Sequence, residues 1–390
     1  MLNEKKNKSG LFVGAVCLAV LYIFLILLDN VFPQNTFTLM LIPVLKKGAI
    51  YSLVCVSMNL LNGFTGLFSL GQAGFMMLGG YAYAILSIPK AQHDAVYQYY
   101  DGGLIKFSIP EALQGIFGDF GGAFIGSIIC IVIAGLVAAI FAALIGIPVL
   151  RLKSDYLAIA TLGFAEILRA IFQWTGLGPI TNGSNLLRKY TSLSAMKIGD
   201  FKLGTLYPFV IATICIAIIV LLINSSYGRA FKAIRDDEIA AEAMGINLFK
   251  HKMMSFVISS FFAGVGGALL AMYQTTIQAT PFKSAMTYEL LLIVVIGGIG
   301  SISGSVIGAF LFIACNEWWL RFLDSGSFMG IPVPFFRDGF RKVVFAVIIM
   351  IVVLFFREGI MGDNEISVEG LKRRFSKFKR KKSDEGKEAA

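Results

Sequence analysis

The chain has 390 residues, of which 57% are apolar and only 15% are charged, and its mean hydropathy is +0.76. Soluble domains carry about 25% charged residues, so this composition indicates a polytopic, all-α membrane protein. The formal net charge of +10 does not point to nucleic acid, because the basic residues gather near the C-terminus, just past an apolar run.

Ten apolar runs reach or approach the roughly 20 residues that cross a bilayer as a helix. The first follows a basic start but ends in "DNVFPQ" without a small-residue cleavage site, so we expect a retained helix rather than a signal peptide. The eighth is short enough to be a half-helix. The predicted segments are 11–28, 37–61, 71–88, 123–150, 156–174, 206–223, 253–273, 286–298, 303–322 and 341–357.

An even number of spans places both termini on one side of the membrane. Under the positive-inside rule, both lie in the cytoplasm, because the loops then assigned to that side hold more than twice as many lysines and arginines as the others. This divides the chain into a cytoplasmic start at 1–10, a transmembrane domain at 11–357 and a basic cytoplasmic tail at 358–390. The tail contains "LKRRFSKFKRKK", which we interpret as an orientation signal near anionic lipid, with a specific lipid or partner site as the alternative.

Three polar stretches interrupt the apolar runs. Residues 89–122 and 175–205 are expected to be long outer loops, rich in turn-forming residues and too short to be enzyme domains. Residues 227–252 are expected on the cytoplasmic side.

Residues that bind metals are scarce. The five cysteines are scattered through apolar runs without ligand spacing, and His93 and His251, the only histidines, are both predicted to lie in loops. We therefore predict no metal site and no catalytic residues.

Two glycine-rich stretches interrupt the helical pattern, at 62–80 ("NGFTGLFSLGQAGFMMLGG") and at 297–308 ("GGIGSISGSVIG"). Such stretches either let helices approach closely or open the backbone along a substrate path, and the composition favours neither. If they form a path, the candidate residues are Asn62, Gly66, Ser69, Gly71, Gln72, Gly74, Gly297, Gly298, Gly300 and Ser301.

Few charges fall inside the apolar runs. Glu166 and Arg169 are three residues apart, so on a helix they share a face and form an intramembrane ion pair, either structural or involved in transport. Lys46 and Lys47 are hard to place in the second segment: their side chains extend toward the interface, or the helix begins later than drawn.

The stretch "YGRAFKAIRDDEIAAEAMGINLFKHK" (227–252) contains a predicted short helix of about two turns. Asp236 or Asp237 is a favoured N-cap, and Gly245 occupies the position of a left-handed C-terminal residue. Apolar side chains fall on one side. A helix of this length is not stable alone, so we expect another surface to hold it.

The spacing of Ala240, Ala241 and Gly245 resembles the "EAA" loop of ABC importer permeases, whose coupling helix sits in a groove of the ATPase. Ile239 stands where the general pattern has Glu, which is expected for one branch, the LivM-type permeases of branched-chain amino acid importers. The stretches at 66–84, 146–172, 288–312 and 354–362 are similar to that branch in the same order. The resemblance covers roughly residues 37–362.

The resemblance implies a non-catalytic permease in a bacterial or archaeal cytoplasmic membrane, forming a path for branched-chain amino acids by alternating access. Its partners would be a second related permease, two cytoplasmic ATPases that bind ATP and Mg²⁺, and an external solute-binding protein. The chain itself has no G-x-x-x-x-G-K-[ST] motif and binds no cofactor. The residues expected to contact the ATPase are Arg235, Asp237, Glu238, Ala240, Ala241, Met244 and Gly245.

Other functions stay open. The same class of importer also carries urea or short amides. A secondary transporter or channel would need a relay of ionisable residues inside the membrane, and an intramembrane enzyme would need converging nucleophiles and bases. The sequence has few ionisable residues inside the apolar runs and only two histidines, so it favours neither of these functions.

Overall fold

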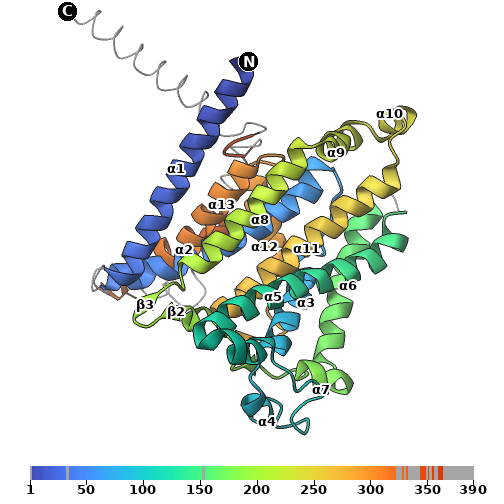
Figure 1. Cartoon of the computed structure of the whole chain (residues 1–390). Helices are drawn as coiled ribbons and strands as arrows, with labels where there is room; N and C mark the ends of the chain where they lie inside the picture. Colours follow the sequence, from blue (N-terminus) through green and yellow to red (C-terminus); the bar gives the residue numbers. More distant parts are fainter. Residues whose placement is uncertain are drawn as a thin grey trace, which may run out of the picture.

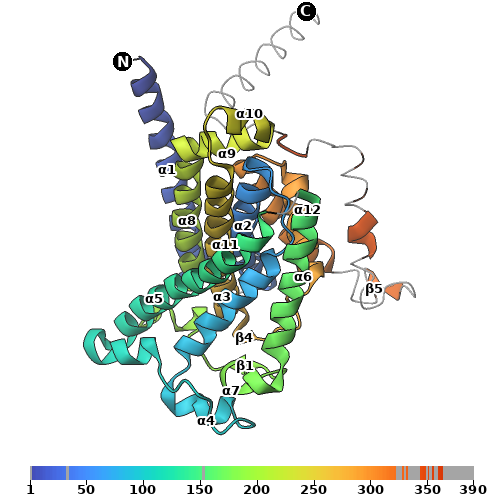
Figure 2. The ribbon, with the colours of Figure 1, turned by 90° about the vertical axis from the view of Figure 1, so that its right-hand side faces the viewer.

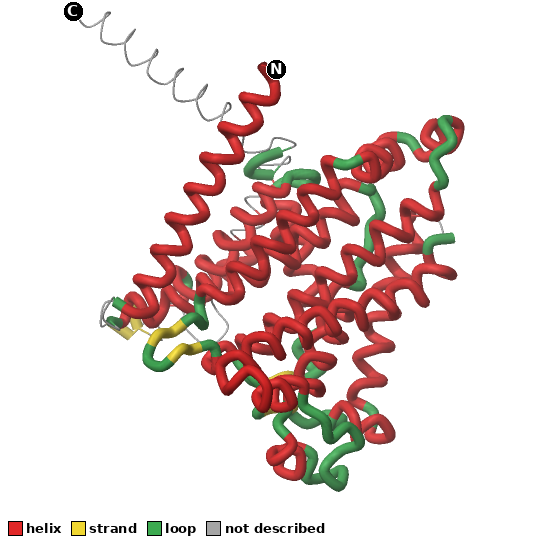
Figure 3. The backbone as a smooth tube through the Cα atoms, viewed as in Figure 1, coloured by secondary structure: helices red, strands yellow, loops and turns green. Residues whose placement is uncertain are grey.

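The computed structural model describes residues 2–31, 35–151 and 154–321, and beyond them 327–328, 331–332, 343–347, 350, 354 and 359–362. The described chain is a bundle of long helices (Figure 1), with only three two-residue strand pairs (Figure 3). The pairs, all antiparallel, are β1 (Leu187–Arg188) with β4 (Thr276–Ile277), β2 (Lys197–Ile198) with β3 (Phe201–Lys202), and β5 (Ser327–Phe328) with β6 (Ile331–Pro332).

Helices occupy the first nine predicted segments; the tenth, 341–357, and the tail lie largely outside the described residues. These helices are α1 (Leu2–Asn30), α2 (Thr36–Asn59), α3 (Gln72–Ser87), α5 (Ile109–Val149), α6 (Ser154–Gln173), α8 (Leu206–Asn224), α11 (Leu248–Gln274), α12 (Ser284–Gly297) and α13 (Ile302–Ala314). Among the described residues, six helices are long and apolar enough to cross a membrane, and Val16–Asn30 and Ser284–Gly297 are shorter apolar helices. The protein is therefore a multi-pass membrane protein, while ten embedded segments and cytoplasmic termini stay predictions.

The boundaries of two helices differ from those predicted. α1 begins at Leu2 rather than at residue 11, and α5 begins at Ile109, within the expected 89–122 loop. A kink at Gly118, where φ is 74°, lets the first part of α5 fold back on the second. The two parts are so close that a Cβ on Gly126 would lie 2.6 Å from the Cα of Pro110. The sequence hid this helix because the turn-forming residues around it are typical of loops.

The two stretches predicted to be outer loops, 89–122 and 175–205, which we call the outer stretches, hold short elements rather than plain loops. These are 3-10 turns at Lys90–Gln92, Thr175–Leu177 and Leu193–Ala195, and helices α4 (His93–Val96) and α7 (Gly178–Thr181). The prediction that both histidines lie in loops was wrong. His93 begins α4, and His251 lies in the first turn of α11, which Asn247 caps through a hydrogen bond from the Lys250 N–H, 3.0 Å long.

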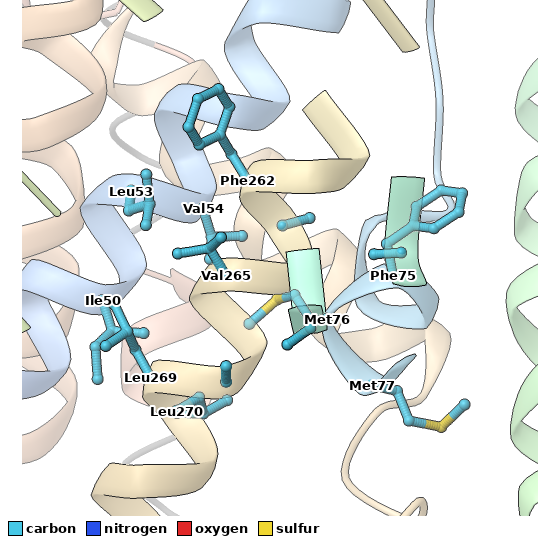
Figure 4. Packing of buried hydrophobic residues seen from close by; sticks show 14 of the residues in the cluster. Ile50, Leu53, Val54, Phe75, Met76, Met77, Phe262, Val265, Leu269 and Leu270 are labelled. Carbon is cyan, nitrogen blue, oxygen red and sulfur yellow. The ribbon is translucent and has the colours of Figure 1, made fainter. Parts of the chain in front are cut away.

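The core gathers around α11, which packs on α2, α3 and α5. Figure 4 shows side chains of α2, such as Val54, and of α3, such as Met76, around Val265 and Leu269 of α11. Small residues let the backbones meet, because a Cβ on Gly79 of α3 would lie 2.1 Å from the carbonyl oxygen of Gly264.

The two ends of the bundle carry different elements. The N-terminus of α1 lies at the same end as α9 (Ser226–Asp236) and α10 (Glu238–Ala243), whereas α4 and α7 lie at the opposite end (Figures 1 and 2). This arrangement places the start of the chain and the 227–252 stretch on one side, which we call the α10 end.

Candidate functional site

α10 is a short helix whose two ends are both capped. The Asp237 carboxylate accepts hydrogen bonds from the N–H groups of Ile239 (2.8 Å) and Ala240 (3.0 Å), so Asp237 rather than Asp236 is the N-cap. At the other end Gly245 has a φ of +84° and donates to the carbonyl of Glu242, and Ile246 donates to the carbonyl of Ala241. These two bonds form a Schellman motif, and they fix a helix of only six residues.

The surface of α10 divides into two sides. Ala241 is buried at 4% exposure within its own chain, and Lys252 of α11 holds Glu238 through an ion pair of 2.6 Å. On the outside, Ile239 is 82% exposed and Met244 is 84% exposed. Of the predicted contact residues, Ala240, Met244 and Gly245 therefore face outward, whereas Ala241 faces inward. Ile239, which the sequence analysis did not select, is the largest apolar side chain exposed within the helix itself.

α9 ties α10 to the bundle. Its apolar side chains Phe231 and Ile234 are buried, and Gly228 permits contact with the end of α8, where a Cβ would lie 2.0 Å from the carbonyl oxygen of Ile223. This stretch was not predicted to be a helix. It is strongly amphipathic, so the signal was present in the spacing of its apolar residues.

Arg235 of α9 reaches the first glycine-rich stretch. Its Nη1 donates to the carbonyl oxygen of Gly63 over 3.2 Å, and its Cγ lies 3.0 Å from the position of a Cβ on Gly66, whose φ is +75°. The Lys232 ammonium lies 5.6 Å from the centre of the Phe64 ring. α9 therefore rests directly on the segment that joins α2 to α3.

That segment is an opened backbone held by side chains. The π-helical turn Leu60–Phe64 ends α2, and residues 65–71 are not helical. The Leu70 N–H donates to the Thr161 hydroxyl (3.0 Å), and the Ala73 N–H donates to the Thr287 hydroxyl (3.2 Å). Such side-chain partners are what exposed backbone groups need inside a membrane.

The predicted path residues of this stretch form further side-chain hydrogen bonds or allow a neighbouring helix to approach. The Asn62 carboxamide accepts from the Ser69 N–H over 3.2 Å, and the Gln72 amide donates to the Ser57 hydroxyl over 2.8 Å. Gly71 and Gly74 allow α6 to approach, because a Cβ on Gly74 would lie 2.9 Å from Ala165. Among these residues, Ser69, Gly71, Gln72 and Gly74 are buried and Gly66 is exposed.

The second glycine-rich stretch is the turn between α12 and α13. A Cβ on Gly297 would lie 2.3 Å from the carbonyl oxygen of Gly304, so glycine here lets the two helices pack closely. Gly298 and Gly300 both have positive φ within the turn, and Ser301 caps α13 by accepting from the Gly304 N–H. The turn also binds residues 359–362, because the N–H groups of Ile360 and Met361 donate to the carbonyls of Ile296 and Gly297.

Asn59, which was not among the predicted site residues, joins the two glycine-rich stretches. Its side chain is fully buried; the amide nitrogen donates to the carbonyl of Ser301 (2.9 Å) and to the hydroxyl of Ser305 (2.8 Å), and its oxygen accepts from the Gly300 N–H (2.9 Å). Of the candidate path residues, Gly300 and Ser301 are therefore bonded directly to this carboxamide, whereas Gln72 and Gly74 of the first stretch contact Ser57 and Ala165 instead. Asn59 is a polar residue inside the apolar run 37–61, and this position could have identified it from the sequence.

Glu166 and Arg169 meet on α6, with 2.7 Å between the Arg169 Nε and the carboxylate. The other Glu166 oxygen accepts from the N–H of Ser284, the first residue of α12, over 3.0 Å. The pair is partly exposed, and the Glu166 carboxylate provides a hydrogen-bond acceptor for the first N–H group of α12.

Lys47 lies inside α2 and has an ion-pair partner, so the second helix does not begin later than predicted. α2 begins well before it, at Thr36, and the Lys47 ammonium lies 2.5 Å from the carboxylate of Glu317 in the π-helical turn Cys315–Trp319. Within the described part of the chain, no group of histidine, cysteine and acidic residues is arranged to hold a metal ion.

Residues 40–355 match the protein family described as the permease component of branched-chain amino acid transport systems. The chain belongs to this family. It is 31% identical over 306 residues to the high-affinity branched-chain amino acid transport permease LivM of Escherichia coli, which covers 72% of the chain and 64% of that protein. The chain thus spans less than two thirds of that relative's length.

Other relatives cover more of their own length. A probable LivM of Methanocaldococcus jannaschii is 23% identical, with 83% of the chain and 94% of that protein covered. The E. coli LivH permease is 25% identical, with 79% and 96% covered. No solved structure matches the chain. The permease family therefore includes relatives of two kinds, LivM and LivH.

Proposed function

We propose that the chain is the permease subunit of an ATP-driven ABC importer in a bacterial or archaeal cytoplasmic membrane, and that it carries branched-chain amino acids by alternating access. The observation that supports this most directly is α10. It is a doubly capped helix outside the bundle, with Ile239 and Met244 more than four-fifths exposed. A helix this short needs a second surface to cover that apolar side, and the groove of an ATPase subunit is the surface that the family resemblance suggests.

In this proposal the chain makes no covalent bond. Two ATPase subunits bind ATP and Mg²⁺, a LivH-like permease pairs with this chain, and a solute-binding protein delivers the substrate from outside. Movement of α10 reaches the bundle through α9, because Arg235 holds the carbonyl of Gly63 and Asn59 holds the α12–α13 turn. A rigid pair of short helices linked by hydrogen bonds suits a hinge or shear motion.

The substrate assignment follows the family, and urea or a short amide is the alternative within the same class. A secondary transporter is the more distant alternative. Glu166 and Arg169 are the two charges it would use, but they already pair with each other and with the start of α12. That arrangement favours a structural role.

Co-purification tests the ATPase contact. Ile239→Ser and Met244→Ser together change side chains that are exposed in this chain, so the subunit should fold normally and recover much less ATPase from native membranes. Ile198→Ser and Leu104→Ser, two exposed apolar residues in the outer stretches, form the matched control. Equal ATPase recovery by both doubles, or none by the wild type, would reject the coupling assignment.

Uptake tests the substrate. Radiolabelled leucine should accumulate in a deletion strain only when the wild-type chain is restored, and the accumulation should need ATP. Leucine uptake that does not respond to the chain, with labelled urea uptake that does, would transfer the proposal to the urea and amide importers. Uptake driven by an ion gradient without ATP would favour a secondary transporter.

A further inference from the structure

An apolar groove of about 530 Å³ lies between α5, α8 and α11, and α5 crosses the other two helices at an angle (Figure 2). Its walls include Ile128 and Val132 of α5, Val210 and Ile214 of α8, and Phe261 of α11. The volume falls within the roughly 300–1,000 Å³ typical of small-molecule pockets. Along α8 the lining runs from Leu206 to Ile218, a rise of about 18 Å, which is close to half of the roughly 30 Å hydrocarbon thickness.

The lining offers no hydrogen-bonding partner to a polar ligand. Tyr207 is its most polar side chain, and its hydroxyl is already bonded to the Ser127 hydroxyl over 2.7 Å. Water needs two to four polar partners to occupy a cavity, and a zwitterionic amino acid needs partners for both charges. The groove therefore suits a hydrocarbon chain and not the transported substrate.

Two lysines lie at the end of the groove that is farther from α10. Lys197 of β2 pairs directly with Lys202 of β3, and both are exposed. The hairpin leads straight into the lining, because the N–H of the next residue, Leu203, bonds to the carbonyl of Met196 over 2.9 Å. Like charges directly opposite each other destabilise a strand pair, so an anion that sits between them would relieve this repulsion.

Neighbouring charges leave this anion site available. Asp200 lies in the turn between the two strands and makes no ion pair with either lysine in the described chain. The carboxylate of Asp29 accepts from the N–H and hydroxyl of Thr205. It keeps its negative charge, which acts on Lys46, and in the described chain it forms no ion pair with Lys197 or Lys202. Lys46 adds positive charge close by, with its ammonium 3.7 Å from the position of a Cβ on Gly204.

We propose that this groove binds one anionic phospholipid of the outer leaflet, with an acyl chain between α5, α8 and α11 and the phosphate between Lys197 and Lys202. The length of the groove matches one leaflet, and the lysines at its outer end match the charge and depth of a phosphate. The exposed lysine pair at the end of the apolar lining gives the charge complementarity that favours a phospholipid over a purely apolar helix of a second permease. The choice of the outer leaflet rests on the proposed orientation with the α10 end in the cytoplasm, and the inference is independent of the transported substrate.

Native mass spectrometry of the purified full chain, titrated with phosphatidylglycerol or with phosphatidylcholine of the same chain length, tests the site. Lys197→Gln with Lys202→Gln should weaken phosphatidylglycerol binding at least about fivefold, as expected from the loss of about 1 kcal/mol or more of phosphate contact. Phosphatidylcholine carries the same phosphate, but its choline cancels the net charge, so its binding should weaken clearly less than that of phosphatidylglycerol. Lys90→Gln with Lys106→Gln removes the same charge from two exposed lysines elsewhere in the outer stretches and should change neither lipid.

Val210→Trp tests the acyl-chain position, because a larger side chain there should fill the groove and weaken both lipids. Leu221→Trp, on the same helix but outside the lining and 71% exposed, is its control. Equal phosphatidylglycerol binding by the two lysine doubles would overturn the headgroup site. Unchanged lipid binding by Val210→Trp would overturn the groove assignment, and loss of a co-purifying permease with that variant would reassign the groove to the subunit interface.

Discussion

Asn59 accepts a hydrogen bond from the backbone N–H of Gly300 over 2.9 Å, across 241 residues of sequence. The bond crosses between the end of α2 and the α12–α13 turn. A Cβ on Gly63 would lie 1.9 Å from the same carboxamide oxygen, so the glycine one turn later leaves room for this contact. Two stretches that look like separate breaks in the sequence thus form one hydrogen-bonded body, on which α9 rests through Arg235.

Asn59→Leu should destabilise the chain and abolish uptake. The substitution leaves the Gly300 N–H without its Asn59 partner in a partly buried place, at a cost of about 1–3 kcal/mol for an unsatisfied group, whereas the Ser301 carbonyl keeps its bonds from the N–H and the hydroxyl of Ser305. The thermal unfolding temperature in detergent should fall clearly. Asn224→Leu is the matched control, because Asn224 is exposed and bonds only to Val220 of its own helix. Equal unfolding temperatures for the two variants would contradict the role of Asn59.

Asp237→Ala should loosen α10 without unfolding the bundle. Loss of an N-cap costs about 0.5–2 kcal/mol, and a six-residue helix has little stability to spare. Hydrogen exchange of the amides at 239–244 should become faster, and ATPase recovery should decrease, whereas Asp237→Ser should retain both. Asp236→Ala is the control, because that carboxylate contacts Arg235 at 3.2 Å rather than the amides of α10. Equal exchange in the two alanine variants would argue against the cap.

The sequence predicted α10 well because its signals are local. An N-cap carboxylate and a glycine with positive φ act within a few residues, so Asp237 and Gly245 can be recognised without the rest of the fold. The positions of the first nine helices could likewise be predicted from hydropathy, because a helix surrounded by lipid or by other helices needs a long apolar run.

The parts that sequence reasoning missed depend on distant contacts. Asn59, Thr161 and Thr287 become important only because segments far apart in the chain bring unpaired backbone groups to them. The role of Gly297 was undecided because close helix packing and an opened backbone require the same residue, and only the 2.3 Å approach to Gly304 identifies packing. Ala241 looks from the sequence like part of the docking surface, but its side chain faces its own chain.

Removing both charges of the α6 pair should be milder than removing one. Glu166→Gln leaves Arg169 without its carboxylate, and we expect a loss of about 1 kcal/mol, reduced by the partial exposure of the pair. The double variant Glu166→Gln with Arg169→Gln keeps an acceptor for the Ser284 N–H and leaves no unpaired charge. Uptake should recover in the double variant. Uptake abolished equally in the single and double variants would indicate a charge used in transport.

His93 should make the outer stretches sensitive to acid. The side chain is only 2% exposed and stacks on Tyr97 with 5.9 Å between ring centres. Burial lowers its pKa below the usual 6.5, and Lys106 lowers it further, whereas the Ile88 backbone, Asp94 and Glu111 act in the opposite direction. Below pH 6.5 the unfolded state therefore binds a proton that the folded state excludes, and stability falls as the pH decreases.

The unfolding temperature should consequently be highest above about pH 6.5 and should decrease toward pH 5. His93→Phe removes the titrating group and keeps an aromatic ring beside Tyr97, so its unfolding temperature should decrease less over the same range. His251→Phe is the control, since that ring lies near the surface at the start of α11. If His251→Phe rather than His93→Phe reduces the acid sensitivity, the buried histidine is not its source.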